Sequence, residues 1–284
     1  MSRPSLRTVI AASLAATALV LGGCATSAPA GGASGEPDAD AGFVTPGKLT
    51  IATGDIAYEP YVVDDDPSSG EGFEAAIAYA IADQLGFAPE DVEWVRTSFE
   101  AAIAPGPKNF DFNIQQYTIT DERKGAVDFS SPYYSASQAV VGINGGPADG
   151  VDSIEGLKGL ALGAMAGSTS AQTIEDVIQP TTAPLLYASN EDAVAAFNAG
   201  QFDAFVIDLP TAYLAVGYPY IENSFIVGEL PAGGIADEWG VVLAKDSPLT
   251  ARVTEAVDAL REDGTLAAIT DEWLGAGQGV TLLK

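Results

Sequence analysis

The sequence predicts an α/β fold with mainly parallel sheets. Short runs rich in β-branched and aromatic residues alternate along the chain with longer segments in which apolar residues recur every three or four positions. The 284-residue chain is 47% hydrophobic and 18% charged, which is typical of a packed globular protein. Because strands that alternate with helices pair in parallel beneath those helices, this pattern favours α/β architecture.

The predicted strands are short runs that contain β-branched, aliphatic or aromatic residues. The strands are expected at 48–53, 110–117, 139–143, 160–165, 204–207 and 241–244. The clearest predicted helix is 72–86, where Phe73, Ile77 and Ile81 form one apolar stripe and Gly86 follows as a stop signal. Further helices are expected at 191–199, with Ser189 or Asn190 as the N-cap, and at about 249–260.

The N-terminus has the pattern of a secretory signal. Two arginines precede the apolar run 9–21, which is too short to cross a bilayer as a stable helix. The run ends in Leu-Gly-Gly before Cys24, the only cysteine in the chain, and this resembles a bacterial lipobox. We therefore expect a signal peptide at 1–23, acylation of Cys24, and an extracytoplasmic protein anchored to the cell membrane. Residues 24–45 are rich in Ala, Gly, Ser and Pro, and they predict a flexible tether.

The composition excludes several function classes. A net charge of -27 repels polyphosphate, so no nucleic-acid partner is expected. The absence of histidine removes the commonest general base and the usual zinc ligand, and no phosphate-binding glycine loop is present. We expect no enzyme activity, no metal and no cofactor.

Several phrases carry a family resemblance. They are LTIATGDIAYEPY (49–61), GFEAAIAYAIADQLGF (72–87), YTITDERKGAVDFSSPYY (117–134), LKGLALGAMAGSTS (157–170), FDAFVIDLPTA (202–212) and WGVVLAKDSPLT (239–250). In this order they resemble the family 3 extracellular solute-binding proteins, the polar amino-acid receptors of ABC transporters. The resemblance covers about 48–274.

The resemblance implies two lobes joined by a two-strand hinge, with the ligand in the cleft between them. The first lobe would comprise 46–137 and 235–284, and the second 138–234, with hinge strands near 138–141 and 231–235. The expected function is capture of a polar or basic amino acid and delivery to an ABC permease and its ATPase subunits, by a monomer. A cyclohexadienyl dehydratase-like enzyme on the same fold, with Glu74 or Asp55 as its acid or base, and a ligand-binding sensor module stay as alternatives.

Arg123 and Asp208 are the two charged residues predicted to bind the α-groups of the ligand. A guanidinium matches a carboxylate with two hydrogen bonds, and the resemblance assigns Arg123 to the ligand's α-carboxylate. Asp208 ends the apolar run 204–207, where a buried carboxylate needs a partner. The resemblance assigns that partner as the α-ammonium.

The other predicted ligand-binding residues are polar or aromatic: Thr118, Ser168 and Thr169 as hydrogen-bond donors, Tyr58 and Phe99 as aromatic walls, and Asp55 beside a cationic side chain. Gln115 and Gln116 stand where relatives carry small residues, so Gln116 is expected to narrow the pocket or bond the ligand. Ser168 and Thr169 could equally be helix caps, and Tyr58 and Phe99 could equally be core residues.

Overall fold

The structure is a computed structural model that describes residues 42–217, 220–232, 237–275 and 279–284. The predicted signal peptide, Cys24 and most of the predicted tether lie outside the described residues. Within the described part of the chain, no helix is long and apolar enough to cross a membrane.

The first sheet has the strand order β2-β1-β3-β12-β4. Its strands are β1 (Leu49–Gly54), β2 (Val92–Thr97), β3 (Phe112–Asn113), β4 (Val127–Phe129) and β12 (Val242–Ala244). β1 pairs in parallel with β2 and β3, whereas β12 runs antiparallel to β3 and β4. The prediction of parallel pairing therefore describes three adjacent strands of this sheet, and the sheet as a whole is mixed.

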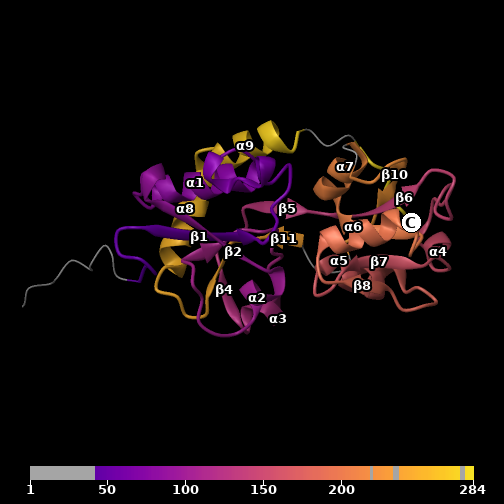
Figure 1. Cartoon of the computed structure of the whole chain (residues 1–284), viewed down its shortest axis with the longest axis horizontal. Coiled ribbons are helices and arrows are strands. Elements are labelled where there is room, and N and C mark those ends of the chain that lie inside the picture. Colours follow the sequence, from indigo (N-terminus) through magenta and orange to yellow (C-terminus); the bar gives the residue numbers. More distant parts are fainter. Residues whose placement is uncertain (1–41, 218–219, 233–236, 276–278) are drawn as a thin grey trace, which may run out of the picture. The chain divides into compact units, whose positions relative to one another are not determined.

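Three helices cover this sheet: α1 (Phe73–Gln84), α8 (Thr250–Glu262) and α9 (Thr265–Trp273), which lie together in Figure 1. The predicted stripe of α1 is buried, since Ile77 and Ile81 pack in one core with Ile51 of β1. The helix begins after Gly72, whose φ is +113°. A Cβ at Gly72 would lie 2.5 Å from the carbonyl oxygen of Tyr61, so only glycine fits this approach.

The second sheet has the order β10-β6-β9-β7-β8. Its strands are β6 (Gln138–Ile143), β7 (Leu162–Met165), β8 (Leu185–Tyr187), β9 (Ala204–Asp208) and β10 (Ser224–Glu229). β7 is parallel to β8 and β9, and β6 is antiparallel to β9 and β10. Successive residues of β6 alternate between two cores, with Val140 on one face and Val141 on the other, as the strand period requires.

Helices pack in both cores of the second sheet. They are α4 (Ile154–Leu157), α5 (Thr169–Thr173), which continues as one π-helical turn (Ile174–Ile178), α6 (Asn190–Asn198) and α7 (Leu209–Gly217). Ile174 and Ile178 belong to the core that contains Val140, and Phe197 of α6 belongs to the core that contains Val141. The short helices α2 (Phe99–Ile103) and α3 (Asp121–Lys124) belong to the segment before β4.

Two further strands, β5 (Tyr134–Ala136) and β11 (Asp237–Trp239), pair antiparallel. β5 follows the last N-terminal strand of the first sheet and precedes β6, and β11 returns the chain from β10 to β12. The predicted hinge strand at 138–141 lies within β6, directly after β5, and its role as a hinge stays a prediction. Most of the other predicted hinge segment lies outside the described residues, and the lobe boundaries stay a prediction.

The C-terminal residues pack on the second sheet, whereas the family resemblance predicts that they belong to the first lobe. The Leu283 amide donates to the Glu229 carbonyl, and the Glu229 amide donates to the Thr281 carbonyl, both at 2.9 Å. Gly228 makes room for this contact, since a Cβ there would lie 2.6 Å from Leu283 Cγ. Burial of the Leu283 side chain fixes these residues, and Leu283 belongs to no helical or alternating pattern in the sequence.

The predicted strand 110–117 is also shorter in the structure, where β3 comprises two residues. Gln116 adopts a left-handed conformation with φ +49°, which ends extended pairing before Thr118. The remainder of this segment instead forms part of the candidate site.

Replacing Leu283 by alanine should destabilise the protein by about 2–5 kcal/mol, because the 1% exposed side chain leaves a cavity beside β10. Chemical denaturation measures this change. Leu282→Ala is the matched control, since its neighbouring side chain is 49% exposed and should cost little. Equal effects of the two variants would contradict the anchored tail.

Candidate functional site

All nine residues predicted to bind the ligand line one cavity of about 230 Å³. Six belong to the segments around the first sheet: Asp55, Tyr58, Phe99, Gln116, Thr118 and Arg123. Three belong to the segments around the second sheet: Ser168, Thr169 and Asp208. The cavity thus brings together residues up to 153 positions apart in the sequence, and their roles toward a ligand stay predictions.

Arg123 supplies a buried positive charge to the cavity. It lies on α3, which begins after Thr120, whose hydroxyl accepts from the Arg123 amide. Its guanidinium donates to the Thr118 carbonyl at 2.8 Å and to the Gly167 carbonyl at 2.9 Å. The side chain is 8% exposed and lies 5.3 Å from the centre of the Phe99 ring. Burial lowers the pKa of Arg123, and no described carboxylate forms an ion pair with it.

Asp208 occupies the end of β9, and its carboxylate is part of a half-buried network. Its Oδ1 accepts from Gln138 Nε2 at 2.5 Å, and the same nitrogen donates to Asp237 Oδ2 at 2.5 Å. Burial and then the negative charge of Asp237 raise the pKa of Asp208 well above its ordinary value. A cation placed in the cavity beside Asp208 would relieve this cost.

The polar cavity residues from the segments around the second sheet, Ser168 and Thr169, form hydrogen bonds with nearby protein groups. The Ser168 hydroxyl caps α5 by accepting from the Ala171 amide at 3.1 Å, and it donates to the Met165 carbonyl at 2.7 Å. Ordinary capping is therefore what its side chain does, and its hydroxyl hydrogen is already used. The Thr169 hydroxyl lies 3.2 Å from the Thr118 hydroxyl across the cavity.

Aromatic rings form part of the cavity wall. Phe99 stacks on Tyr117 at a centroid distance of 4.5 Å, and Tyr58 packs edge-on against Tyr61 at 5.7 Å. The Tyr58 hydroxyl accepts from Asn190 Nδ2 at 3.0 Å, and the Tyr61 hydroxyl lies 2.8 Å from the Thr211 hydroxyl. The Tyr58 side chain therefore joins two sides of the cavity, while Tyr61 and Thr211 make their contact outside its lining.

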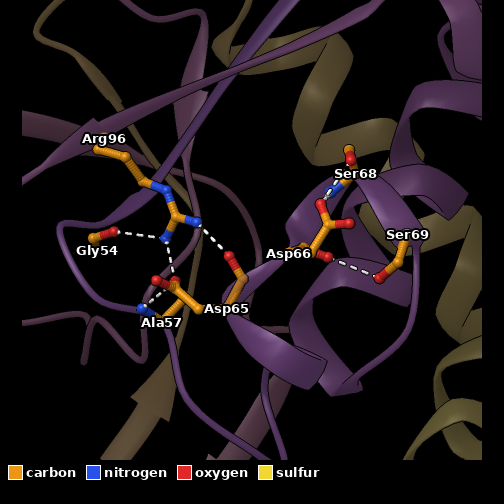
Figure 2. A network of polar contacts seen from close by, with 7 residues as sticks. All are labelled: Gly54, Ala57, Asp65, Asp66, Ser68, Ser69 and Arg96. Atoms are coloured by element: carbon orange, nitrogen blue, oxygen red, sulfur yellow. Dashed lines mark hydrogen bonds and ion pairs between the residues drawn. The ribbon is translucent and has the colours of Figure 1, made fainter.

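A network around Arg96 holds the loop that carries Asp55 and Tyr58 (Figure 2). Arg96 donates to the Gly54 carbonyl at 2.9 Å and to Asp65 Oδ1 at 2.7 Å. The same oxygen accepts from the Ala57 amide at 2.8 Å. Because the guanidinium is paired with Asp65 on the surface, the loop 54–65 is closed at its base and its cavity-facing residues are positioned in advance.

Glu74, at the start of α1, lies behind the cavity. Its carboxylate accepts from the Gln116 amide at 2.8 Å, from the Gln116 side-chain nitrogen and from the Tyr133 hydroxyl. Burial raises the pKa of Glu74 to about 7, an effect that these hydrogen bonds oppose. Gln116 thus directs a side-chain donor toward Glu74, and this contact holds its left-handed backbone in the cavity wall.

Acidic groups outnumber basic groups around the cavity. Asp55 and Glu191 line it together with Asp208, whereas Arg123 is the only basic residue among its described lining residues. Neither Asp55 nor Glu191 forms an ion pair with a described residue. No group of three or more potential metal-ligating side chains comes together among the residues that the structure describes.

Gln138, Asp237, Asn190 and Glu191 also belong to this region, although they were not among the residues predicted from the sequence. Glu191 and Asn190 were assigned to a helix start, and their cavity position depends on where α6 packs. Gln138 and Asp237 come from β6 and β11, which are 99 residues apart. No local sequence pattern signals such a pair.

Comparisons with known proteins agree with this geometry. The model of the bacterial extracellular solute-binding proteins, family 3, matches residues 49–276. The L-arginine-binding protein of Pseudomonas aeruginosa is 28% identical over 229 residues, which cover 77% of this chain and 85% of that protein. The ABC transporter glutamine-binding protein GlnH of Bacillus subtilis is 29% identical over 216 residues, covering 74% and 75%.

A solved structure is also similar. An ancestral arginine-binding protein bound to arginine is 32% identical, with a TM-score of 0.67, and the match covers 80% of this chain and 98% of that one. The family model, the related sequences and the similar solved structure therefore point to one kind of protein.

The raised pKa of Glu74 predicts a specific pH dependence of stability. Since the folded-state pKa is about 7 and the ordinary value is 4.5, the folded protein holds a proton that the unfolded chain releases between these values. Unfolding free energy should therefore fall by up to roughly 3 kcal/mol as pH rises through this window. Glu74→Gln should remove this part of the dependence.

Denaturation of the wild type and Glu74→Gln at pH 5 and pH 8 measures the difference. Glu71→Gln is the control, because this neighbouring carboxylate is exposed. A wild type and a Glu74→Gln variant with the same pH dependence would contradict the burial of a proton at Glu74.

Proposed function

The chain belongs to the bacterial extracellular solute-binding proteins, family 3, and from that premise we propose that it captures an amino acid for an ABC importer. One observation carries the proposal. A buried guanidinium without an ion-pair partner and a buried carboxylate with a raised pKa line the same cavity. The α-carboxylate and α-ammonium of an amino acid supply the two missing opposite charges.

Arg123 binds the α-carboxylate in this proposal. Two of its donors are used by the Thr118 and Gly167 carbonyls, and the guanidinium carries five in total. The remaining donors give charge-assisted hydrogen bonds, which are the stronger kind. The Phe99 ring shields one face of the guanidinium from water.

Asp208 binds the α-ammonium. Pairing the carboxylate with a cation offsets the desolvation that raises its pKa, so ligand binding and ionisation of Asp208 support each other. The zwitterion then bridges residues attached to different sheets. Such bridging shifts the equilibrium between open and closed lobes toward the closed form.

The side chain of the ligand extends toward Asp55 and Glu191. After the two α-groups have paired with Arg123 and Asp208, these two carboxylates remain uncompensated in the cavity wall. A cationic side chain would neutralise them, whereas a neutral one would leave their repulsion in place. Among polar amino acids the charge balance therefore favours a basic one, in keeping with the arginine named for two of the similar proteins.

The closed monomer delivers its ligand to a permease, and ATP hydrolysis takes place on further subunits. Acylated Cys24 anchors the chain outside the cytoplasm, with residues 24–45 as a tether. For the dehydratase alternative, Glu74 is a poor acid or base, since it is enclosed by Tyr133 and Gln116 outside the cavity lining. No observation favours the sensor module over the importer.

Arg123→Ala should weaken binding of L-arginine and L-glutamine alike by at least roughly 2 kcal/mol, about thirtyfold, because the bound carboxylate loses its charged partner. Calorimetric titration measures the loss. Lys124→Ala is the control, since this adjacent cation is exposed and pairs with Asp121 on the surface. If Arg123→Ala binds like the wild type, the assignment of the site is wrong.

The double variant Asp55→Asn and Glu191→Gln tests the part of the cavity that is proposed to hold the ligand's side chain. It should lower affinity for L-arginine by about tenfold, since each partly exposed pair contributes up to about 1 kcal/mol, and should leave L-glutamine nearly unchanged. Asp192→Asn, an exposed acid next to Glu191, is the control. An equal loss for both amino acids would remove the case for a basic ligand.

A further inference from the structure

Asp237 belongs to the site network without lining the ligand cavity. It lies on β11, and its Oδ1 accepts from the Thr118 hydroxyl at 2.5 Å. Its Oδ2 accepts from Gln138 Nε2 at 2.5 Å, and the Thr169 hydroxyl lies 3.4 Å from Oδ1. One side chain on β11 thus contacts residues on both sides of the cavity.

The bond to Asp237 determines which way the Thr118 hydroxyl points. A hydroxyl has one hydrogen to donate, and a carboxylate can only accept. Because the Thr118 hydrogen is given to Asp237, the Thr118 oxygen presents only lone pairs to other partners. It can therefore accept from an ammonium and has no hydrogen for the ligand's carboxylate, although the sequence analysis expected Thr118 to be a donor.

The orientation of Gln138 is determined in the same way. The Ser170 hydroxyl donates to Gln138 Oε1 at 2.7 Å, so the amide nitrogen faces the other side. There Nε2 gives one hydrogen to Asp208 and one to Asp237. A neutral amide thus holds two carboxylates close together, and their repulsion is left for a cation to relieve.

Resting on the proposed function, we propose that Asp237 is a positioning residue that turns the Thr118 hydroxyl into an acceptor and makes this end of the cavity specific for an α-ammonium. Asp208 contacts the ammonium directly, and Asp237 acts through Thr118 and through Gln138. Replacement of Asp237 should therefore weaken amino acids with a free α-amine more than compounds that carry only the carboxylate and the side chain.

Asp237→Asn tests this role because asparagine matches the shape but not the acceptor pattern. Whichever way its amide is turned, the NH₂ group meets a donor, either Gln138 Nε2 or the Thr118 hydroxyl. If the NH₂ group faces Thr118, the Thr118 hydroxyl becomes an acceptor from it, and the hydroxyl hydrogen then points toward the ligand's ammonium. Glu238→Gln is the matched control, since this adjacent carboxylate on β11 is exposed.

The probes are L-arginine and 5-guanidinopentanoic acid, which lacks only the α-amine, titrated calorimetrically at up to millimolar concentrations. Asp237→Asn should weaken L-arginine at least tenfold and 5-guanidinopentanoic acid less than threefold, and Glu238→Gln should change neither. An equal loss for both probes would show a merely structural role and overturn the inference, while the proposed function stands. A wild type that binds no α-amino acid would instead overturn the proposed function, and the amine specificity with it.

Thr118 gives a second test that does not depend on the folding of Asp237→Asn. Thr118→Ser keeps the hydroxyl and should retain the preference for ligands with an α-amine. The isosteric Thr118→Val should bind L-arginine at least tenfold more weakly than the wild type. In the Thr118→Val background, Asp237→Asn should cost at least threefold less than it does in the wild type. Equal losses for serine and valine, or fully additive losses for the double variant, would contradict the route through the hydroxyl.

Discussion

The Arg123 guanidinium is the charge around which the cavity is organised. It is 8% exposed and bonded to two main-chain carbonyls, one from Thr118 and one from Gly167. A buried cation is costly unless an anion accompanies it, and carbonyl oxygens satisfy its donors without neutralising its charge. The fold therefore keeps a buried positive charge whose counter-charge has to come from outside the protein.

The opposite requirement holds at the other end of the cavity. Asp208 and Asp237 share one neutral amide donor, so negative charge accumulates where β9 ends. A zwitterion satisfies both ends at once, and neither a simple cation nor a simple anion does. Since Arg123 and Asp208 belong to segments around different sheets, the ionic contacts proposed to select the ligand would also hold the two sides of the cavity together.

Local patterns in the sequence predicted much of this architecture. Contacts between segments that are distant in the sequence account for what these patterns did not predict. The stripe of α1 and the apolar run of β9 were readable because helix and strand periods bury fixed positions. The resemblance placed Arg123 and Asp208, and the structure brings them to one cavity. The contact between Gln138 and Asp237 and the docking of Leu283 depend on distant segments meeting, which no local period encodes.

The short β3 has a similar explanation. The aromatic and aliphatic residues within 110–117 favour extended backbone, but the buried Glu74 carboxylate accepts from the Gln116 amide, and Gln116 adopts a left-handed conformation. A tertiary hydrogen bond here outweighs local strand propensity. From the sequence, Gln115 and Gln116 were expected to narrow the pocket. In the structure their hydrogen bonds to Tyr117 and Glu74 also support the cavity wall.

The central claim is that the cavity binds a zwitterion with an α-carboxylate and an α-ammonium. A thermal-shift screen of the purified protein against the twenty amino acids and their desamino and decarboxylated analogues tests it most directly. A basic amino acid at a hundred times its dissociation constant should add about 2.7 kcal/mol of stability, and analogues that lack either α-group should add far less. Stabilisation by no α-amino acid, or equal stabilisation by the analogues, would contradict the account.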